Sequence, residues 1–215
     1  MNDLKVVIFD WDGTLVDSQE RIVTCLRESA RDIGLPVLGD EVYADIIGLG
    51  LYEAIERLYP GMTEPTISAY RDGYARQFVQ FEREPSGFFD GALDVLTELR
   101  NRGHLLAVAT GKSRRGLDRT LRSLGLETFF DATRCADETA SKPNPQMLYE
   151  IVEQLSCNAD QAVMIGDTEY DLEMATRAGT HSIGVSHGVH HPERLQRHAP
   201  RHIVDSLHEL LDVIA

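Results

Sequence analysis

Residues 6–15 read Val6-Val7-Ile8-Phe9-Asp10-Trp11-Asp12-Gly13-Thr14-Leu15, and the rest of the chain is arranged around them. Four apolar residues in succession predict a buried strand. The strand ends at two acids separated by one residue, so both carboxylates can point to the same side, and Gly13 permits a sharp turn. Two crowded carboxylates repel each other unless a cation lies between them, and Mg²⁺ prefers oxygen ligands. The stretch therefore predicts a strand that delivers Asp10 and Asp12 to a cation site.

This stretch has three other possible interpretations, namely a polar turn, a calcium loop and a dinucleotide site. The residues could form only a polar turn, since Asp-Gly is a common turn pair. A calcium loop would need a third oxygen ligand two residues after Asp12 and then a glycine, but Thr14 and Leu15 stand there. A dinucleotide site would need Gly-x-Gly-x-x-Gly after the strand, and that motif is missing. The polar turn stays open, and the other two are excluded.

The composition limits the class of protein. The chain has 215 residues, 42% of them hydrophobic, which is enough for one large domain or one domain with an insert. Its formal net charge of −14 predicts no nucleic-acid partner and no membrane partner, because phosphates and anionic lipids would repel it. No apolar run reaches membrane length, and the N-terminus lacks a signal-peptide pattern. Cys25, Cys135 and Cys157 are far apart and odd in number, which predicts reduced thiols in a cytoplasmic protein.

Residues 17–90 differ in character from the rest of the chain. Apolar side chains recur there at helical spacing, and no strand pattern is present. The expected helices cover residues 22–33, 41–47, 52–59 and 65–81. Residues 84–87 have the composition of a return linker. We therefore expect residues 17–88 to form a helical cap inserted into a core made of residues 1–16 and 89–215.

After Asp90 the pattern alternates between helices and strands. Strands are expected over residues 105–109, 131–135, 162–165, 182–185 and 202–204. Helices are expected over residues 91–102, 114–124, 145–155 and 171–178. A last helix opens with Ser206 three residues before Glu209, which is a capping box. This alternation predicts an α/β fold with a doubly wound parallel sheet, a Rossmann-like core.

Polar clusters follow the strands of this predicted sheet. Asp10 and Asp12 follow the first strand, and Thr110-Gly111-Lys112 follows the second. Gly166-Asp167-Thr168-Glu169-Tyr170-Asp171 follows the strand at 162–165, and Lys142 stands just before a helix that a proline can open. Sites in open parallel sheets form beyond the carboxyl ends of the strands. We expect the four clusters to meet in one crevice.

Each cluster also has a purely structural explanation. Thr110-Gly111 could cap the next helix, a role that Ser113 could also fill. Helix N-termini favour acids, so capping could explain Asp167 and Asp171, which would share one face if Asp167 began the helix. Lys142 could be a solvated loop residue. Four such clusters at four equivalent places favour a common site over four separate coincidences.

This set of side chains suits phosphoryl transfer. Asp10 can attack phosphorus and form an acyl phosphate. Asp12 can protonate the leaving alkoxide and then deprotonate the water that releases phosphate. The hydroxyl of Thr110 and the backbone N–H groups from Gly111 onward can hold phosphoryl oxygens at a helix start. Lys142 can neutralise the phosphate and the nucleophile together.

A cation would complete the set, because phosphoryl transfer needs positive charge around the phosphate oxygens. Asp10, the backbone carbonyl of Asp12 and Asp167 can ligate Mg²⁺. Asp171 would orient these ligands.

The four clusters resemble, in order and spacing, the four motifs of the haloacid dehalogenase superfamily, namely Asp10-Trp11-Asp12-Gly13-Thr14-Leu15-Val16-Asp17-Ser18, Thr110-Gly111, Lys142-Pro143, and Gly166-Asp167 with Asp171. The helical insert resembles the small α-helical cap of the phosphoglycolate-phosphatase-like branch. The resemblance covers nearly the whole chain. It implies a Mg²⁺-dependent phosphatase that hydrolyses a small phosphorylated metabolite through an aspartyl phosphate, as a monomer or a homodimer.

Two kinds of observation limit which substrate and which reaction are expected. One is where this sequence departs from the family pattern, and the other is what related activities of the superfamily require. Trp11 replaces the commoner Phe, and its side chain is expected to face away from the acids. Thr110-Gly111-Lys112 differs from the Thr-Asn of that branch, which weakens phosphoglycolate as the substrate. Dehalogenases lack the second acid, so Asp12 argues against that activity. A sugar-phosphate mutase uses a cap His, and residues 17–90 contain none. A mutase and a non-catalytic phosphate-binding regulatory protein remain the alternatives.

Two further regions carry weaker signals. Gly48, Leu49 and Gly50 are expected to face the site as part of a lid, and Arg21 and Arg57 are candidate contacts for a substrate anion, although both could be ordinary surface residues. Seven of the eight histidines lie between His181 and His208, with no spacing of acids or cysteines that supports a metal site. A polar, partly exposed loop after Val185 is expected, with some of these histidines at the rim of the site.

Overall fold

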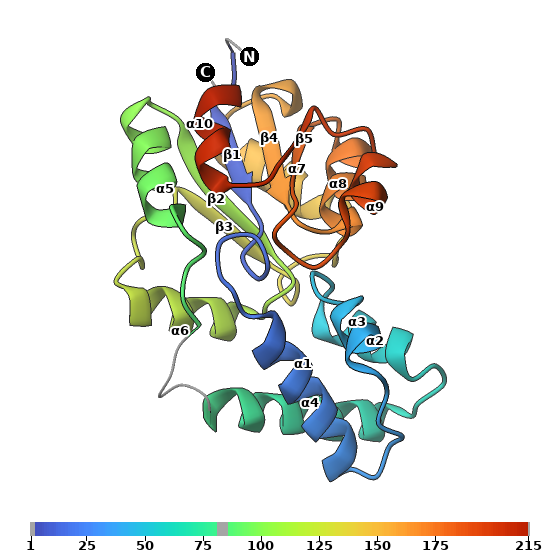
Figure 1. Cartoon of the computed structure of the whole chain (residues 1–215). Helices are drawn as coiled ribbons and strands as arrows, with labels where there is room; N and C mark the ends of the chain where they lie inside the picture. Colours follow the sequence, from blue (N-terminus) through green and yellow to red (C-terminus); the bar gives the residue numbers. More distant parts are fainter. Residues whose placement is uncertain (1–2, 81–85, 215) are drawn as a thin grey trace.

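The computed structural model describes residues 3–80 and 86–214. The described residues form one six-stranded parallel sheet with the strand order β3-β2-β1-β4-β5-β6. The strands are β1 (Val6–Phe9), β2 (Leu105–Thr110), β3 (Ala132–Cys135), β4 (Ala162–Gly166), β5 (His181–Val185) and β6 (His202–Val204). Each strand expected from the sequence is present, and β1 lies inside the sheet between β2 and β4 (Figure 1).

Helices cover both faces of the sheet because the strand residues alternate. Val7 and Phe9 of β1 enter one apolar cluster, whereas Val6 and Ile8 enter the other. The first cluster is covered by α5 (Ala92–Asn101), α6 (Arg114–Leu124) and α10 (Leu210–Val213). The second is covered by α7 (Gln146–Gln154) and α8 (Glu169–Ala178). The predicted doubly wound α/β fold is therefore confirmed.

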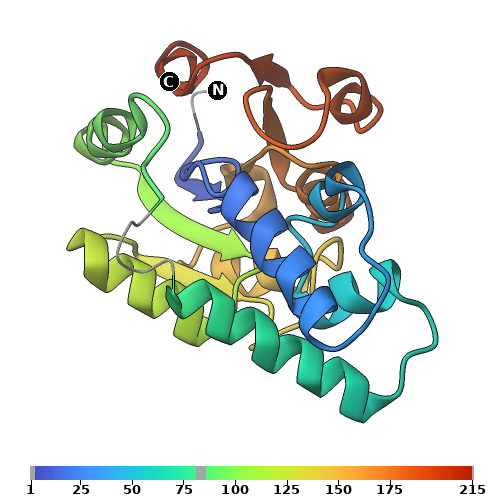
Figure 2. The same cartoon turned by 60° about the horizontal axis from the view of Figure 1, so that its bottom comes forward.

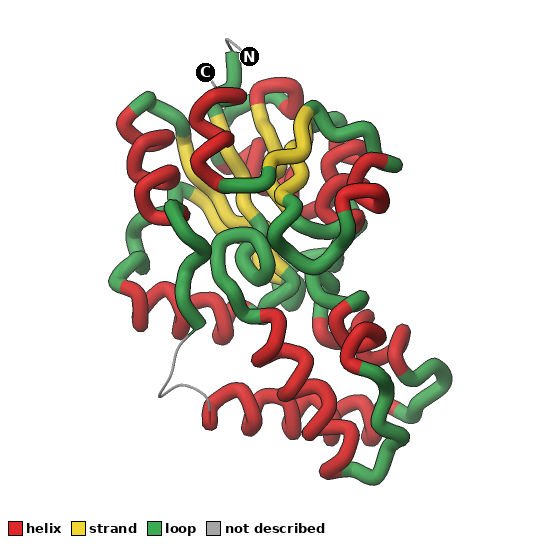
Figure 3. The backbone as a smooth tube through the Cα atoms, viewed as in Figure 1, coloured by secondary structure: helices red, strands yellow, loops and turns green. Residues whose placement is uncertain are grey.

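The segment after β1 forms a group of helices beside the sheet. It contains α1 (Gln19–Asp32), α2 (Asp40–Ala44), α3 (Leu51–Leu58) and α4 (Glu64–Gln80). These helices share an apolar cluster of their own, built around Tyr43, Ile55 and Tyr70, and α1 packs along α4 (Figure 2). Among the described residues of this group no strand is present, as Figure 3 shows. The predicted linker lies partly outside the described residues.

Local details differ from the sequence expectations in three places. Asp167 precedes α8, whose N-cap is Thr168 in a capping box with Asp171, so the two acids do not share one helical face. A short helix, α9 (Pro192–Gln196), was not predicted, although Pro192 at its first position was a usable signal. The capping box of Ser206 and Glu209 is present, but its first turn is a 3₁₀ turn (Leu207–Glu209) that precedes α10.

Two other expectations can be compared with the structure. Cys25, Cys135 and Cys157 are free thiols. Within residues 3–80 and 86–214, no helix combines the length and the apolar composition that crossing a bilayer requires.

Candidate active site

The register of the sheet brings the chain segments of the site together. Phe9, the last residue of β1, pairs with Val108 of β2 and with Ile165 of β4. The backbone N–H of Asp10 then donates to the carbonyl of Ile165 at 2.9 Å. The residues that follow these strands therefore meet at one edge of the sheet, next to the helical group (Figure 1).

Asp10 is the most enclosed acid on the cavity wall. Its side chain is 1% exposed, and its Oδ1 accepts the backbone N–H of Trp11 at 2.6 Å and lies 2.8 Å from Nζ of Lys142. Its Oδ2 is buried and has no hydrogen-bond partner among the described residues. Burial raises the pKa of Asp10 well above its usual value, Lys142 opposes this shift, and Asp171 and Asp167 add to it. One carboxylate oxygen of Asp10 is thus left available for another atom.

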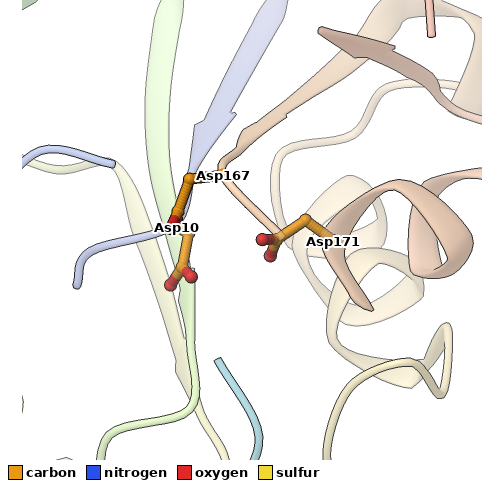
Figure 4. A group of neighbouring side chains, drawn as sticks. All are labelled: Asp10, Asp167 and Asp171. Atoms are coloured by element: carbon orange, nitrogen blue, oxygen red, sulfur yellow. The ribbon is translucent and has the colours of Figure 1, made fainter. Parts of the chain in front are cut away.

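Three buried carboxylates form a cluster around Asp10. Oxygen atoms of Asp10, Asp167 and Asp171 all lie within 4.8 Å of one another, and Figure 4 shows the Asp171 carboxylate pointing toward the other two. Asp167 accepts the hydroxyl of Thr14 at 2.8 Å and the backbone N–H of Val189 at 2.9 Å. Burial, followed by the charge of Asp171, raises the pKa of Asp167 to about 7. The cluster stores charge repulsion that a cation would relieve.

Lys142 ties this cluster together. Its Nζ lies 2.6 Å from Oδ1 of Asp171 and 2.8 Å from Oδ1 of Asp10, and its side chain is fully buried. Thr168 donates to the other oxygen of Asp171 through its hydroxyl at 2.7 Å and its backbone N–H at 3.2 Å. A solvated loop lysine, the structural explanation for Lys142, is excluded by this burial.

Asp12 has a different environment. Nζ of Lys112 donates to both of its oxygens at 2.8 and 2.9 Å, and the hydroxyl of Ser18 donates to Oδ1 at 2.7 Å. Its carboxylate does not belong to the cluster of three, so the metal ligand predicted from Asp12 rests on its backbone carbonyl alone. Trp11 points into the core, where its ring contacts Phe88 and Phe130 edge to face.

The Thr110-Gly111 turn does not serve as the cap of α6. Ser113 is the N-cap, and its hydroxyl oxygen accepts the backbone N–H of Gly116. Thr110 is fully buried, and its hydroxyl oxygen accepts the backbone N–H of Lys112 at 3.2 Å. The capping explanation for this turn is therefore wrong, and the turn lies at the wall of the cavity instead.

A cavity of about 600 Å³ lies between the sheet edge and the helical group. From the core side it is lined by Asp10, Asp12 and residues 110–113. Residues 46–54 and one side of α4 line it from the helical group. The carboxylates of Asp10 and Asp12 therefore face a space that could hold a substrate of substantial size.

The loop of Gly48, Leu49 and Gly50 closes one side of this cavity. A Cβ on Gly111 would lie 2.4 Å from the Leu49 carbonyl oxygen, so the two backbones are in direct contact. The backbone N–H of Gly50 donates to the hydroxyl of Ser141 at 2.7 Å. The loop thus lies where the sequence placed it, between the helical group and the site.

The two arginines proposed as anion contacts do not line this cavity. A guanidinium nitrogen of Arg57 lies 3.7 Å from Asp45, and the group stacks on the ring of Tyr170 at 5.5 Å. Arg21 borders a smaller pocket of about 210 Å³ beside Ser18. Within the part of the chain that the structure describes, the cations that line the large cavity are Lys112, Arg71 and Arg119.

The loop after β5 reaches the site, as expected for some of its histidines. Nε2 of His187 lies 3.1 Å from the carbonyl of Thr14. His190 is 2% exposed, and its Nδ1 accepts the backbone N–H of Glu169 at 3.0 Å, so this residue is not part of an exposed loop. No group of potential metal ligands within the described residues contains a histidine. The loop supports Asp167 through its backbone, because the N–H of Val189 donates to the carboxylate of that residue.

Sequence reasoning missed several residues that hold the site. Thr14, Ser18 and Lys112 were quoted in motifs but received no role. The rarity of lysine was a usable signal, because only Lys5, Lys112 and Lys142 occur in the chain and two of them contact the two acids of the first motif.

Comparisons with known proteins agree with this geometry. The sequence model of the haloacid dehalogenase-like hydrolases matches residues 7–185. The "Probable phosphatase IndB" of Dickeya dadantii (strain 3937) is 35% identical over 96% of this chain and 91% of its own length. The phosphoglycolate phosphatase of Vibrio parahaemolyticus serotype O3:K6 is 28% identical over 99% of this chain and 97% of its own.

A solved structure gives the same result. A predicted phosphatase from Clostridium acetobutylicum superposes with a TM-score of 0.87 at 30% identity, and the match covers 98% of each chain. With a family match over residues 7–185 and relatives similar over nearly their whole length, the chain belongs to the haloacid dehalogenase-like hydrolase family, in the branch that includes these phosphatases.

Proposed function

We propose that this protein is a Mg²⁺-dependent phosphatase that hydrolyses a small phosphorylated metabolite through a phosphoryl group carried on Asp10. The observation that supports this most strongly is the state of Asp10. It borders the cavity, keeps one buried oxygen without a partner, and lies against Lys142 and two further carboxylates. A buried carboxylate with a free oxygen next to positive charge is suited to nucleophilic attack on phosphorus.

The donor set fits a hard divalent cation. All three clustered groups are carboxylates, their oxygens lie within 4.8 Å of one another, and burial with mutual repulsion raises the pKa of both Asp10 and Asp167. Mg²⁺ accepts oxygen ligands and would supply charge neutralisation for the phosphate and the nucleophile. Asp10, Asp167 and the backbone carbonyl of Asp12 would hold it, with Asp171 orienting them through Lys142 and Thr168.

The first chemical step transfers the phosphoryl group to the protein. A carboxylate oxygen of Asp10 attacks phosphorus as the bond from phosphorus to the ester oxygen breaks. Asp12 gives a proton to that departing oxygen, so that the leaving group departs as a neutral alcohol. Thr110, the N–H groups after it and Lys142 hold the remaining phosphoryl oxygens.

The second step returns Asp10 to its starting state. Asp12, now ionised, removes a proton from a water molecule as the water oxygen attacks phosphorus. The bond between phosphorus and the Asp10 oxygen breaks and inorganic phosphate leaves. Lys112 and Ser18 fix the position of Asp12 for both proton transfers, because they bind both of its oxygens.

The cavity also bears on the alternative activities. A mutase needs a group that retains the transferred phosphate or manages protons from the cap side, and no histidine is among the described residues that line the cavity. A non-catalytic phosphate-binding protein would not need an acid held next to the nucleophile. We also propose that residues 17–88 act as the cap, that the protein works in the cytoplasm with its three thiols reduced, and that it is a monomer or a homodimer.

A panel of phosphorylated metabolites tests the proposal. The purified protein is assayed for phosphate release with Mg²⁺ and with chelator, and Asp10→Asn serves as the inactive control. We expect release that depends on Mg²⁺ and on Asp10. Release that persists in Asp10→Asn, or full activity in chelator after metal removal, would contradict the proposal.

A further inference from the structure

The position of the leaving group follows from the position of Asp12. The departing oxygen must lie within hydrogen-bond reach of this acid. Lys112 binds Asp12 with 2.8 and 2.9 Å contacts, and its Nζ lies 4.9 Å from the centre of the Phe78 ring. The carbon atoms next to the departing oxygen therefore enter a space bounded by Asp12, Lys112 and Phe78.

A second aromatic ring borders the same space. Tyr74 lies one helical turn before Phe78 on α4, both line the cavity, and their ring centroids are 5.5 Å apart with planes 40° from parallel. Burial and then the charge of Asp12 raise the pKa of Tyr74, which agrees with a position close to that acid. The side of α4 that faces the acids thus presents two aromatic surfaces to whatever leaves the phosphate.

The cavity extends far beyond a two-carbon fragment, and its remaining walls are mixed, with aliphatic side chains beside polar ones such as Tyr52, Ser68 and Arg71. The aliphatic part of the lining comes from α1, from the loop before α3 and from the first residue of α3, namely Ile22, Leu26, Ile46, Ile47, Leu49 and Leu51. A volume of about 600 Å³ lies in the range of pockets that enclose drug-sized ligands, roughly 300–1,000 Å³. A phosphorylated two-carbon acid would leave most of this volume filled with water.

The charged side chains on the described walls balance in sign. Among the described residues, and apart from Asp10 and Asp12, the charged lining residues are three acids and three bases, namely Glu53, Asp72, Asp137, Arg71, Lys112 and Arg119. Lys112 is already bound to Asp12 through both carboxylate oxygens. A carboxylate on the leaving group would therefore meet no net positive charge from these described residues, whereas an uncharged ring would gain contact with the aromatic rings of Phe78 and Tyr74.

We infer that the preferred substrate is a phosphate monoester whose alcohol carries an uncharged planar ring, aromatic or heterocyclic, that lies against Phe78 and Tyr74. This inference rests on the proposed phosphatase function. It assigns Phe78 and Tyr74 as specificity residues, because they touch the leaving group and take no part in bond making.

The test compares leaving groups of similar chemical reactivity on the unmodified protein. kcat/KM is measured with Mg²⁺ for benzyl phosphate, cyclohexylmethyl phosphate and phosphoglycolate. We expect benzyl phosphate to exceed cyclohexylmethyl phosphate by about two- to tenfold, the range of an aromatic contact. It should exceed phosphoglycolate by tenfold or more, because burial of additional apolar groups contributes further. Equal values for the benzyl and cyclohexylmethyl esters, or a preference for phosphoglycolate, would overturn the inference.

Variants test the two rings directly. Phe78→Leu and Tyr74→Leu keep an apolar side chain and remove the aromatic face, so each should reduce the ratio of benzyl to cyclohexylmethyl activity toward one. Tyr149→Leu is the control, because Tyr149 is an exposed aromatic residue on α7 that does not line the cavity. An unchanged ratio in folded Phe78→Leu and Tyr74→Leu would contradict the assignment. If the protein released phosphate from none of the three esters and from no compound of the panel, the result would instead count against the phosphatase function itself.

Discussion

Two acids separated by one residue have opposite surroundings, and this difference makes their roles separable. Asp10 is buried against Lys142 with one oxygen free of partners, whereas Asp12 is held on both oxygens by Lys112 and on one by Ser18. The first environment suits a nucleophile and the second suits a fixed proton carrier. The sequence alone predicted the pair from its spacing.

Substitution of each acid should therefore give a different kinetic result. Asp10→Asn should abolish both turnover and the covalent phosphoprotein. Asp12→Asn should slow turnover by about 10²–10⁴-fold, and more for alkyl than for aryl phosphates, because a good leaving group needs less help from an acid. Aryl phosphates should then show a burst and accumulation of phosphorylated Asp10. Rapid-quench kinetics measures this, and a loss that is equal for both kinds of ester would contradict the role of Asp12.

Contacts between side chains that lie far apart in the chain could not be predicted from the sequence. Lys112 and Asp12 are 100 positions apart, and nothing in either local pattern indicates that they bind each other. Asp171 was expected only to orient the ligands, and its carboxylate oxygen lies as close to Asp10 and Asp167 as a ligand would. Such distances depend on the register of the sheet and on the start of α8, which local patterns do not fix.

At the scale of elements, β1, β2 and β4 were predictable because each is a short apolar run between breakers, whereas β3, which contains Thr133 and Arg134, gave a weaker pattern. Helix α9 was not, because its five residues lie within a polar, histidine-rich segment. The meeting of β1, β2 and β4 at one edge follows from parallel topology, so the sequence could predict that the polar residues after these strands lie close together. The contact of the Gly48–Gly50 loop with Gly111 needed the structure.

This contact predicts that Gly111→Ala impairs closure over the site. The new Cβ would lie 2.4 Å from the Leu49 carbonyl oxygen, and a backbone atom cannot turn aside as a side chain can. We expect kcat/KM to fall by about 10- to 100-fold, since a misplacement of roughly 1 Å can have that effect. Gly87→Ala is the control, because a Cβ there meets no atom within 4 Å. Equal activity of the two variants would refute the role of the contact.

A second contact joins the helical group to the core through Asp45. This carboxylate contacts Arg194, and its backbone carbonyl accepts the hydroxyl of Tyr170 at 2.9 Å. Arg194 also contacts Glu169, so it stays on the core if Asp45 is removed. The pair therefore connects the two parts of the molecule without belonging to the catalytic set.

Asp45→Ala should weaken this connection and raise KM by about two- to tenfold, with little change in thermal stability, because partly exposed ion pairs contribute little to folding. Asp40→Ala is the matched control. Asp40 pairs with Arg27 at 2.6 Å inside the helical group, so its removal leaves the contacts of Asp45 with the core in place. Steady-state kinetics and melting curves of both variants measure the changes in KM and in thermal stability. A KM that is equally raised in both would show that the effect is not specific to the connection.

At the scale of the whole molecule, the chain is strongly acidic and also buries several carboxylates at one place. The net charge of −14 was visible in the sequence, as was the exclusion of nucleic acid that it predicts. The concentration of Asp10, Asp167 and Asp171 in one buried cluster was expected from topology, but the raised pKa values of Asp10 and Asp167 depend on burial, which only the fold reveals. Because these carboxylates can bind either protons or a cation, the folding stability of the protein depends on both pH and metal.

The raised pKa values of Asp10 and Asp167 determine the direction in which these acids change the folding stability with pH. Free aspartate has a pKa of about 3.9, whereas burial raises the pKa of Asp167 to about 7 and raises that of Asp10 as well. Between these values the folded protein holds protons that the unfolded chain releases. In the metal-free protein the contribution of these two acids to stability is therefore lost as pH rises from about 4 to 7. Burial lowers the pKa of His104, His181 and His190, which acts in the opposite direction below about pH 6.5.

A cation binds the ionised carboxylates and competes with their protons, so the stabilisation by Mg²⁺ should grow as pH rises. At saturating Mg²⁺ we expect Tm to increase by about 5–10 °C at pH 8, for a concentration near one hundred times Kd, and by less at pH 6. The contribution of the histidines is present with and without metal, so it cancels in the difference between the two melting temperatures. Asp167→Asn should make that difference small at both pH values. A difference that is equal at pH 6 and pH 8 in the unmodified protein would show that these carboxylates do not hold the metal.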